Sequence, residues 1–374
     1  MKINKVIGYC LSSSYGDGNV FGQPLGAKSI GLVEVHTDSG IIGIGETYAG
    51  VYVPELIEPT VRFIESLILG MNPLDIHKVY DCMNIPFVGA GGLIRSVVGA
   101  IEIALWDIKG QAEHKPIYEL LNEDSINSFD VYASGGSVAF DVDDIKQDVE
   151  YILDEGFSAY KMRVGVKSWG EDLQRVETAR NILGYNSLMV DAIMGTLDKW
   201  NASDAIHKIN DLEKYNLTWI EEPIHPSNLN ELRCVYTNIN IPIATGEALS
   251  GKLEFDSYLN SGTVDIIQPD ITHCGGYIEA MRVIKEAKDR DIKVALHVWG
   301  SSVSLLSAVH LARSCDVDWL EIPNVELSFM FEKYHELKNM VLHDSYILGD
   351  GLGIHIPEDT KNSYKFIEGS GYRL

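Results

Sequence analysis

Residue types that can carry acid–base or metal chemistry recur through the last two thirds of this 374-residue chain. Each follows a short apolar run typical of a buried strand, as Asp191 follows SLMV and His297 follows IKVAL. The positions are Lys161, Arg163, Asp191, Glu221, Glu247, Asp270, His297 and Glu321. Successive runs lie roughly 25 to 30 residues apart, the length of one strand-plus-helix unit of a (β/α)8 barrel. In such a barrel the carboxyl ends of all strands meet at one mouth, so we expect these side chains to surround one pocket.

Three of these positions are carboxylates that follow three successive strand-like runs, Asp191, Glu221 and Glu247. Any one of them could be an ordinary ion-paired or solvated side chain. Three in register, with no matching basic residue nearby in sequence, favour a divalent cation, and oxygen ligands with added waters suit octahedral Mg2+. Glu222 follows Glu221 directly, so its side chain should point elsewhere and support the rim of the barrel.

His297 and Asp270 lie one strand–helix unit apart and should therefore occupy neighbouring strands. A carboxylate can hold an imidazole in one tautomer and raise its basicity, which predicts a general acid–base pair. The alternative for His297, in the apolar run VALHVWG, is a buried histidine with a structural partner. Lys161 and Arg163 alternate on one strand, so both should face the same side, opposite His297, and flank a metal-bound ligand.

This set of groups suits removal of a proton next to a carboxylate. A divalent metal that chelates the carboxylate lowers the cost of negative charge on it, so a weak base such as His or Lys can take the poorly acidic α-proton. The product is an enediolate. From there the site can return a proton, expel a β-hydroxyl group or open a ring, depending on which acid faces the leaving group.

The elements that position these residues can be outlined from periodicity. Residues 1–50 alternate apolar and polar side chains, with a turn at Asp38, Ser39 and Gly40, which predicts an antiparallel hairpin or meander. From Pro54 to about Leu121 the apolar residues take helical spacing. From about residue 129 strands alternate with amphipathic helices, which predicts a parallel α/β barrel, and the tail shows short alternating strands. We expect helices within 145–157, 173–184, 203–215 and 277–291.

Composition excludes several functions. The net charge of −24 and the sequence pI near 4.7 disfavour nucleic-acid and anionic-membrane partners, because the summed field repels both. The five cysteines form no CxxC pair and are odd in number, so neither a disulfide framework nor a structural zinc site is indicated. No apolar run is long enough to span a membrane, and the first residues lack the apolar core of a secretory signal. We therefore expect a folded cytoplasmic protein that acts on a small molecule.

The chain resembles the enolase superfamily, mandelate racemase subgroup, over nearly its whole length. The resemblance is carried by AIEIALWDIKG, PIYELL, YKMRVG, VDAI, WIEEP, ATGEAL, IIQPD with CGG, HVWG, WLEIP and GLGI. It implies an N-terminal α+β capping domain at residues 1–125, completed by 350–374, and a (β/α)7β barrel at 126–349. It also implies homo-oligomers, either dimers or octamers, and specificity loops around Ser14 to Gln23 and near Thr47 and Tyr48.

For the site, the resemblance implies Mg2+ on Asp191, Glu221 and Glu247, a His297–Asp270 dyad, and Glu321 hydrogen-bonded to a substrate carboxylate. The chain departs from the family pattern twice. The usual Lys-x-Lys pair is Lys161-Met162-Arg163, and Ile193 stands where many relatives have Asn.

Because a guanidinium group is a poor proton acceptor, two-base racemisation is disfavoured. The sequence therefore favours a sugar-acid dehydratase that makes a 2-keto-3-deoxy acid. The alternatives are a cycloisomerase that opens a lactone or anhydro ring, then a racemase or epimerase, and, in a different class, a non-catalytic sugar-acid-binding protein on the same scaffold.

Overall fold

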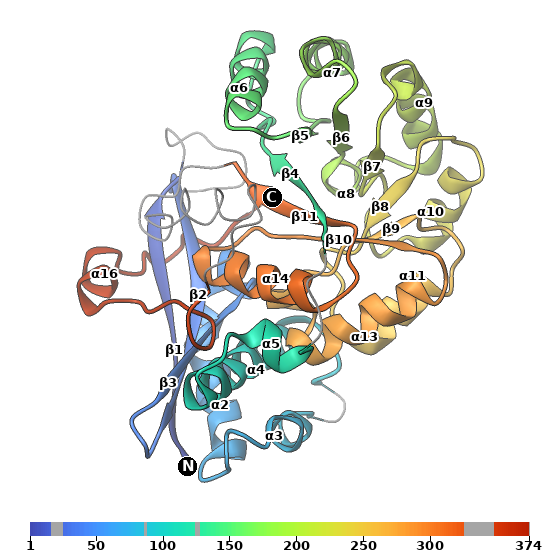
Figure 1. Cartoon of the computed structure of the whole chain (residues 1–374). Coiled ribbons are helices and arrows are strands. Elements are labelled where there is room, and N and C mark those ends of the chain that lie inside the picture. The colour runs from blue at the N-terminus through green and yellow to red at the C-terminus, as the bar shows by residue number, and fades with distance from the viewer. Residues whose placement is uncertain (16–24, 86–87, 124–127, 325–347, 374) are drawn as a thin grey trace.

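The computed structural model describes residues 1–15, 25–85, 88–123, 128–324 and 348–373. Its N-terminal part is an antiparallel three-stranded meander of order β1-β2-β3, as the alternating pattern predicted. The strands and the elements that follow them are β1 (Ile3–Ser14), β2 (Ala27–Thr37), β3 (Ile42–Thr47), α1 (Ala49–Tyr52), η1 (Pro54–Leu56), α2 (Ile57–Ile68), α3 (Ile76–Cys82), α4 (Gly92–Glu113) and α5 (Ile117–Leu121). Figure 1 shows these elements on one side of the molecule and the barrel on the other.

Helix α4 lies between the two parts and is buried over most of its length. It packs against β3 on one side and against helices of the barrel domain on the other. Gly43 and Gly45 of β3 lie directly on the α4 backbone, where any Cβ would collide with the carbonyl groups of Ala104 and Ala100. Glycine is therefore required at both positions for the sheet to approach the helix this closely.

The second part is a closed barrel of eight parallel strands, which confirms the predicted TIM-like fold. Its strands are β4 (Asp130–Ser134), β5 (Ala159–Arg163), β6 (Ser187–Asp191), β7 (Trp219–Glu221), β8 (Ile243–Thr245), β9 (Ile266–Ile267), β10 (Lys293–Leu296) and β11 (Trp319–Pro323). The barrel closes where β11 pairs with β4, so side chains far apart in sequence face one another.

Amphipathic helices lie outside the strands and confirm the four predicted helical segments. The helical and turn segments that follow the strands are α6 (Val142–Asp154), α7 (Trp169–Leu183), α8 (Ile193–Asp198), α9 (Ala202–Leu212), η2 (Glu213–Tyr215), α10 (Leu229–Tyr236), α11 (Gly251–Leu259), α12 (Ile271–Cys274), α13 (Gly276–Lys288) and α14 (Ser302–Ser314). Capping boxes fix the starts of α6 and α7, through Asp141 with Asp144 and Ser168 with Glu171. None of the helices in the described ranges is long and apolar enough to cross a membrane.

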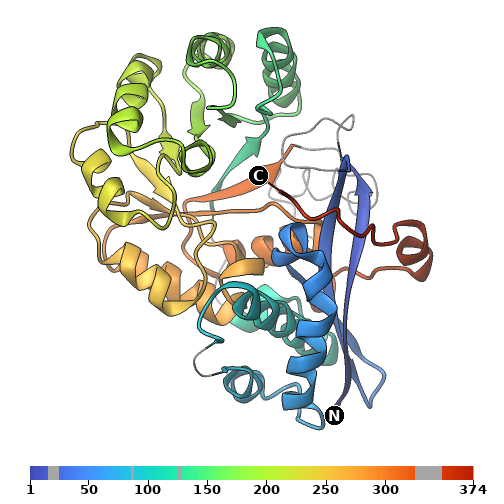
Figure 2. The same cartoon turned by 180° about the vertical axis from the view of Figure 1, so that it is seen from behind.

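The predicted strands of the C-terminal tail are wrong. Within residues 348–373 the tail forms one helix, α16 (Glu358–Ser363), and otherwise irregular chain that makes isolated bridges such as Leu11 to Lys365. The acidic pair Glu358 and Asp359 follows Pro357 at the start of α16, an arrangement that favours a helix N-terminus over a strand. Figure 2 shows the tail crossing the three-stranded sheet and ending beside the barrel.

Candidate active site

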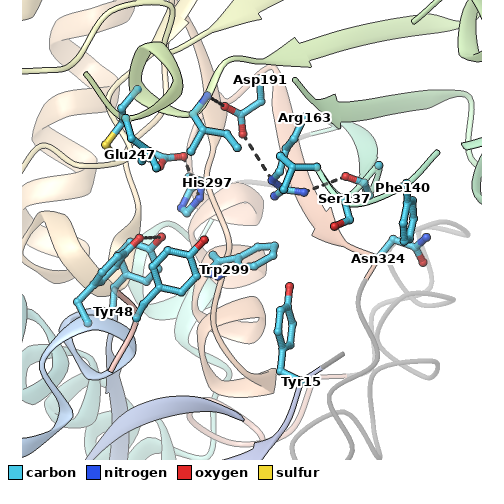
Figure 3. Close-up of a pocket in the computed structure, with 18 residues that line it drawn as sticks. Tyr15, Tyr48, Ser137, Phe140, Arg163, Asp191, Glu247, His297, Trp299 and Asn324 are labelled. Carbon is cyan, nitrogen blue, oxygen red and sulfur yellow. Dashed lines mark hydrogen bonds and ion pairs between the residues drawn. The ribbon is translucent and has the colours of Figure 1, made fainter. Parts of the chain in front are cut away.

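A pocket opens at the carboxyl ends of the barrel strands and is closed on the other side by the N-terminal part (Figure 3). Barrel loops and capping elements both supply its walls. The lining residues are Tyr15, Tyr48, Tyr52, Gly135, Gly136, Ser137, Val138, Phe140, Arg163, Asp191, Ile193, Met194, Leu197, Glu247, His297, Trp299, Asn324 and Tyr372.

The three candidate metal ligands lie on adjacent strands of the barrel. Asp191 ends β6, Glu221 ends β7, and Glu247 follows the end of β8 by two residues. Asp191 and Glu247 line the pocket, whereas Glu221 is fully buried beside them. Glu222 turns away from this group, since it has a φ of 46° and accepts a hydrogen bond from the Thr245 hydroxyl.

Each carboxylate has a cationic neighbour that the sequence spacing did not reveal. The Nζ atom of Lys161 lies 2.5 Å from Glu221, 2.9 Å from Glu321 and 4.0 Å from Asp191. Burial alone would lower the pKa of Lys161, but Glu221 and Glu321 raise it well above its usual value. The carboxylates have no basic partner nearby in sequence, but strand β5 lies beside β6 and brings Lys161 to them in space.

The chemistry of the carboxylates still fits a hard divalent cation. Burial and the charge of Glu221 raise the pKa of Asp191, and burial raises the pKa of Glu247, which shows that negative charge is crowded here. In the described residues no three His, Cys, Asp or Glu side chains converge on one point, since Glu221 is turned to Lys161 and Glu247 to His297. Asp191, Glu221 and Glu247 nonetheless offer hard carboxylate oxygens, the donor type that suits a divalent cation such as Mg2+.

His297 follows β10 and is almost fully buried at the pocket. Its Nδ1 atom lies 2.8 Å from Oδ2 of Asp270, whose other oxygen accepts hydrogen bonds from the backbone and hydroxyl of Thr272. Burial would lower the pKa of His297, but Glu247, Glu321 and Asp270 raise it to about 9. With Nδ1 held by Asp270, Nε2 is the atom that faces the pocket, 3.2 Å from Glu247.

Arg163 forms the opposite wall (Figure 3). Its guanidinium group donates to the Gly135 carbonyl at 2.8 Å and to the Ser134 hydroxyl at 3.1 Å, and it lies 3.7 Å from Asp191. The group also stacks over the ring of Trp299, 4.7 Å from its centroid. Arg163 is therefore a fixed cation, since its pKa is raised by Asp191 and Glu321 despite burial.

Two buried residues of the N-terminal part hold the segment that carries His297 and Trp299 in place. Lys28 is buried, donates to the Trp299 carbonyl at 2.7 Å and lies 4.1 Å from the centre of the indole ring. Glu46, also buried, accepts hydrogen bonds from the backbone amides of Ser301 and Ser304, each at 3.0 Å. We call Lys28, Glu46 and their partners Trp299, Ser301 and Ser304 the inter-domain clamp.

The structure places Tyr48 of the expected specificity regions at the pocket, together with Tyr15. Residues 16–24, where most of the expected loop around Ser14 to Gln23 falls, lie outside the described residues. Sequence reasoning missed Tyr52 and Tyr372. It also missed Trp299 and the segments after β4 and β11, although the same strand-end rule would have found Ser137 and Asn324.

The segment after Asp191 differs from a regular helix. Residues 193–198 all have positive φ angles, so α8 is a left-handed turn, and the backbone of Ile193 donates to Asp191 at 2.7 Å. Left-handed turns cost roughly 1–2 kcal/mol for each non-glycine residue, and such strain concentrates at functional sites. The turn presents Ile193, Met194 and Leu197 to the pocket, where the expected relatives' Asn would have added a polar group.

Comparison with known proteins gave consistent matches. Residues 144–360 match the family described as Enolase C-terminal domain-like, and residues 23–122 match the Mandelate racemase / muconate lactonizing enzyme, N-terminal domain. The chain is 31% identical to 3,6-anhydro-alpha-L-galactonate cycloisomerase of Streptomyces coelicolor, over 71% of this chain and 73% of the relative. It is 28% identical to L-talarate/galactarate dehydratase of Salmonella typhimurium, over 91% and 83%. Among solved structures, a racemase from Streptomyces coelicolor A3(2) with bound magnesium superposes with a TM-score of 0.74 at 26% identity, covering 85% of this chain and 88% of that one.

Proposed function

Since the chain belongs to the mandelate racemase/muconate lactonizing enzyme subgroup of the enolase superfamily, we propose that it is an enzyme that removes the proton α to a sugar-acid carboxylate and then eliminates water. The observation that carries the proposal is the buried His297–Asp270 pair, which shares one pocket with the fixed cation Arg163, while Lys161 lies fully buried beside Glu221 and Glu321. One base and nearby fixed positive charge suit an elimination that passes through an enediolate.

In the first step the Nε2 atom of His297 takes the α-proton, and the electrons of the C–H bond move into the carboxylate. Asp270 holds Nδ1 and stabilises the imidazolium that forms. Lys161 and Arg163 neutralise the charge that develops on the carboxylate oxygens. A Mg2+ ion held by Asp191, Glu221 and Glu247 would supply further electrostatic stabilisation of that charge.

In the second step the enediolate expels the β-oxygen. The C–O bond breaks, the leaving hydroxide takes a proton from a pocket acid such as protonated His297, and the enol product tautomerises to a 2-keto-3-deoxy acid. Glu321 accepts a backbone hydrogen bond from Val298 and pairs with Lys161, and it is fully buried beside His297 without lining the pocket, so the expected contact with a substrate carboxylate remains a prediction. Arg163 is charged at all physiological pH values, which disfavours it as a second base for racemisation.

A cycloisomerase is the second candidate, because the same elimination with a ring oxygen as leaving group opens a lactone or anhydro ring. The wall made by Phe140, Ile193, Met194, Leu197 and Trp299 favours a substrate with an apolar ring face over one with a hydroxyl on every carbon. The relatives include both reaction types, since one is a cycloisomerase and another a dehydratase.

The test is a screen of the purified protein with Mg2+ against aldonic acids, aldaric acids, their lactones and anhydro acids. Semicarbazide detects 2-keto acid products, and NMR in D2O detects proton exchange. A keto product from an open-chain acid supports dehydration, and one from a cyclic acid supports cycloisomerisation. Exchange without keto product would indicate an epimerase, and ligand binding without any turnover would indicate a non-catalytic binding protein.

A further inference from the structure

The C-terminal tail is fastened to the first two strands by hydrogen bonds along its length. Ser12 of β1 donates its amide to the Tyr364 carbonyl at 3.1 Å, and its hydroxyl accepts from the amide of Ile367 at 2.9 Å. Further along, the hydroxyl of fully buried Ser370 lies 2.6 Å from that of Ser29 on β2. The tail therefore follows one fixed path across the sheet toward the barrel (Figure 2).

The last hydrogen bond of the tail lies next to the pocket. The amide of Tyr372 donates to the Val51 carbonyl at 2.8 Å. Gly371 packs so closely on α1 that an added Cβ would lie 2.5 Å from the Tyr52 carbonyl oxygen, a separation that real Cβ atoms do not show. Only glycine permits this approach, so the direction of the chain is set immediately before Tyr372.

Tyr372 lines the pocket and meets other aromatic residues there. Its ring packs edge-on against Tyr52, with centroids 5.6 Å apart, and the Tyr52 hydroxyl lies 3.0 Å from that of Tyr48. Tyr48 in turn packs against His297, with centroids 5.6 Å apart. Tyrosine rings thus connect the tail to the base.

The hydroxyl of Tyr372 has no hydrogen-bond partner within the described part of the chain, whereas those of Tyr48 and Tyr52 satisfy each other. Burial raises the pKa of Tyr372, so the phenol keeps its proton and can donate a hydrogen bond. Tyr372 enters the pocket from the capping side, whereas Arg163, which lines the same pocket, belongs to the barrel strand β5. A ligand bound by its carboxylate at the barrel strands would extend its other end toward the capping side of the pocket, where Tyr372 lies.

We propose that Tyr372 is a specificity-determining residue whose hydroxyl donates a hydrogen bond to an oxygen of the substrate beyond the β-carbon. The proposal rests on the proposed function, since it takes a sugar acid as the ligand. Tyr372 of the tail therefore completes the substrate-binding wall, and its hydroxyl distinguishes long sugar acids from short acids that carry only the reacting carboxylate.

The experiment compares the unaltered protein with Tyr372→Phe, Tyr372→Ala and the matched control Tyr185→Phe, since Tyr185 is fully exposed. Binding is measured by calorimetry in the presence of Mg2+, with oxalate as the short acid. Galactarate, D-galactonate, arabinonate and 3,6-anhydro-L-galactonate serve as long acids. Thermal unfolding of each variant checks the fold.

Tyr372→Phe is expected to raise the Kd of the tightest long acid about 3- to 10-fold, the usual effect of losing one hydrogen bond, and to leave the Kd of oxalate unchanged. Tyr372→Ala should raise the first Kd more than tenfold, and Tyr185→Phe should change neither. Unchanged affinity of Tyr372→Phe for every long acid that the unaltered protein binds overturns the proposal. If the unaltered protein binds no long acid, whether or not it binds oxalate, the proposed substrate class itself is wrong. The proposed role of Tyr372 is then wrong as well.

Discussion

Replacement of His297 by asparagine tests the proposed base with little disturbance of the fold. The asparagine amide can occupy the place of Nδ1 and donate to Asp270, which is 2.8 Å from Nδ1 now, so the buried carboxylate keeps a partner. The atom removed is Nε2, which faces the pocket and lies 3.2 Å from Glu247. The variant therefore lacks the group that takes the proton and retains most of its surroundings.

A positioned general base contributes typically 10²- to 10⁴-fold to a rate, or about 3–5 kcal/mol of activation free energy. We expect His297→Asn to lower keto-acid formation and α-proton exchange in D2O by at least that factor. Binding of Mg2+, measured by calorimetry, should persist, because the three proposed ligands Asp191, Glu221 and Glu247 are untouched. His207→Asn, at an exposed position of α9, is the control and should keep full activity. Turnover of His297→Asn within tenfold of the unaltered protein would refute the assignment of His297 as the essential base.

Other substitutions and conditions test neighbouring parts of the argument. Arg163→Lys should lower kcat/KM about 10- to 100-fold, because the ammonium group lacks the rigid planar fork whose two nitrogens donate to Gly135 and Ser134. NMR in D2O should also show new epimer exchange, and its absence would show that this position cannot reach the α-carbon. Added Mg2+ should lower the pKa of His297 from about 9, because the ion neutralises the charge of Glu247. NMR titrations that give the same pKa for His297 with and without Mg2+ would contradict the metal site. Buried His310 accepts a hydrogen bond from the Tyr118 amide, and burial lowers the pKa of His310 to about 4. Between pH 6.5 and pH 4 the folded protein therefore binds fewer protons than the unfolded chain. Acidification in that range lowers the free energy of unfolding. The free energy of unfolding falls by about 3 kcal/mol at pH 4. His310→Gln, whose amide can replace both hydrogen bonds, should not show this fall when its unfolding in urea is measured at the two pH values. Equal acid sensitivity of the two proteins would exclude His310 as its cause.

The barrel and the positions of its polar residues could be predicted because both follow local rules. A short apolar run followed by a charged residue marks the end of a parallel strand, and closure of the barrel brings all such ends together. Asp191 and Glu221 are indeed the last residues of β6 and β7, and His297 directly follows β10. The pairing of neighbouring strands was enough to bring Asp270 to His297.

Contacts made by irregular chain could not be predicted in this way. Tyr372 reaches the pocket only because the tail packs across the sheet, a path set by tertiary hydrogen bonds that have no sequence period. The prediction for the tail was wrong because alternation in ILGDGLGIHI resembles strands, whereas the described residues 348–356 pair only in an isolated bridge between Gly351 and Pro116. The partners of Lys161 were missed for a related reason, since its ion pairs cross strands and lie far apart in sequence.

The inter-domain clamp has a consequence for how members of such a family can be recombined. Lys28 and Glu46 come from the first domain, yet they hold the loop that carries the proposed base. A chimaera that joins this barrel to a capping domain from another protein would acquire new specificity loops and would also lose the anchor of its own base. Selection for a new substrate can therefore exchange pocket side chains one at a time, whereas exchange of the whole domain must preserve a lysine and a glutamate that do not line the pocket.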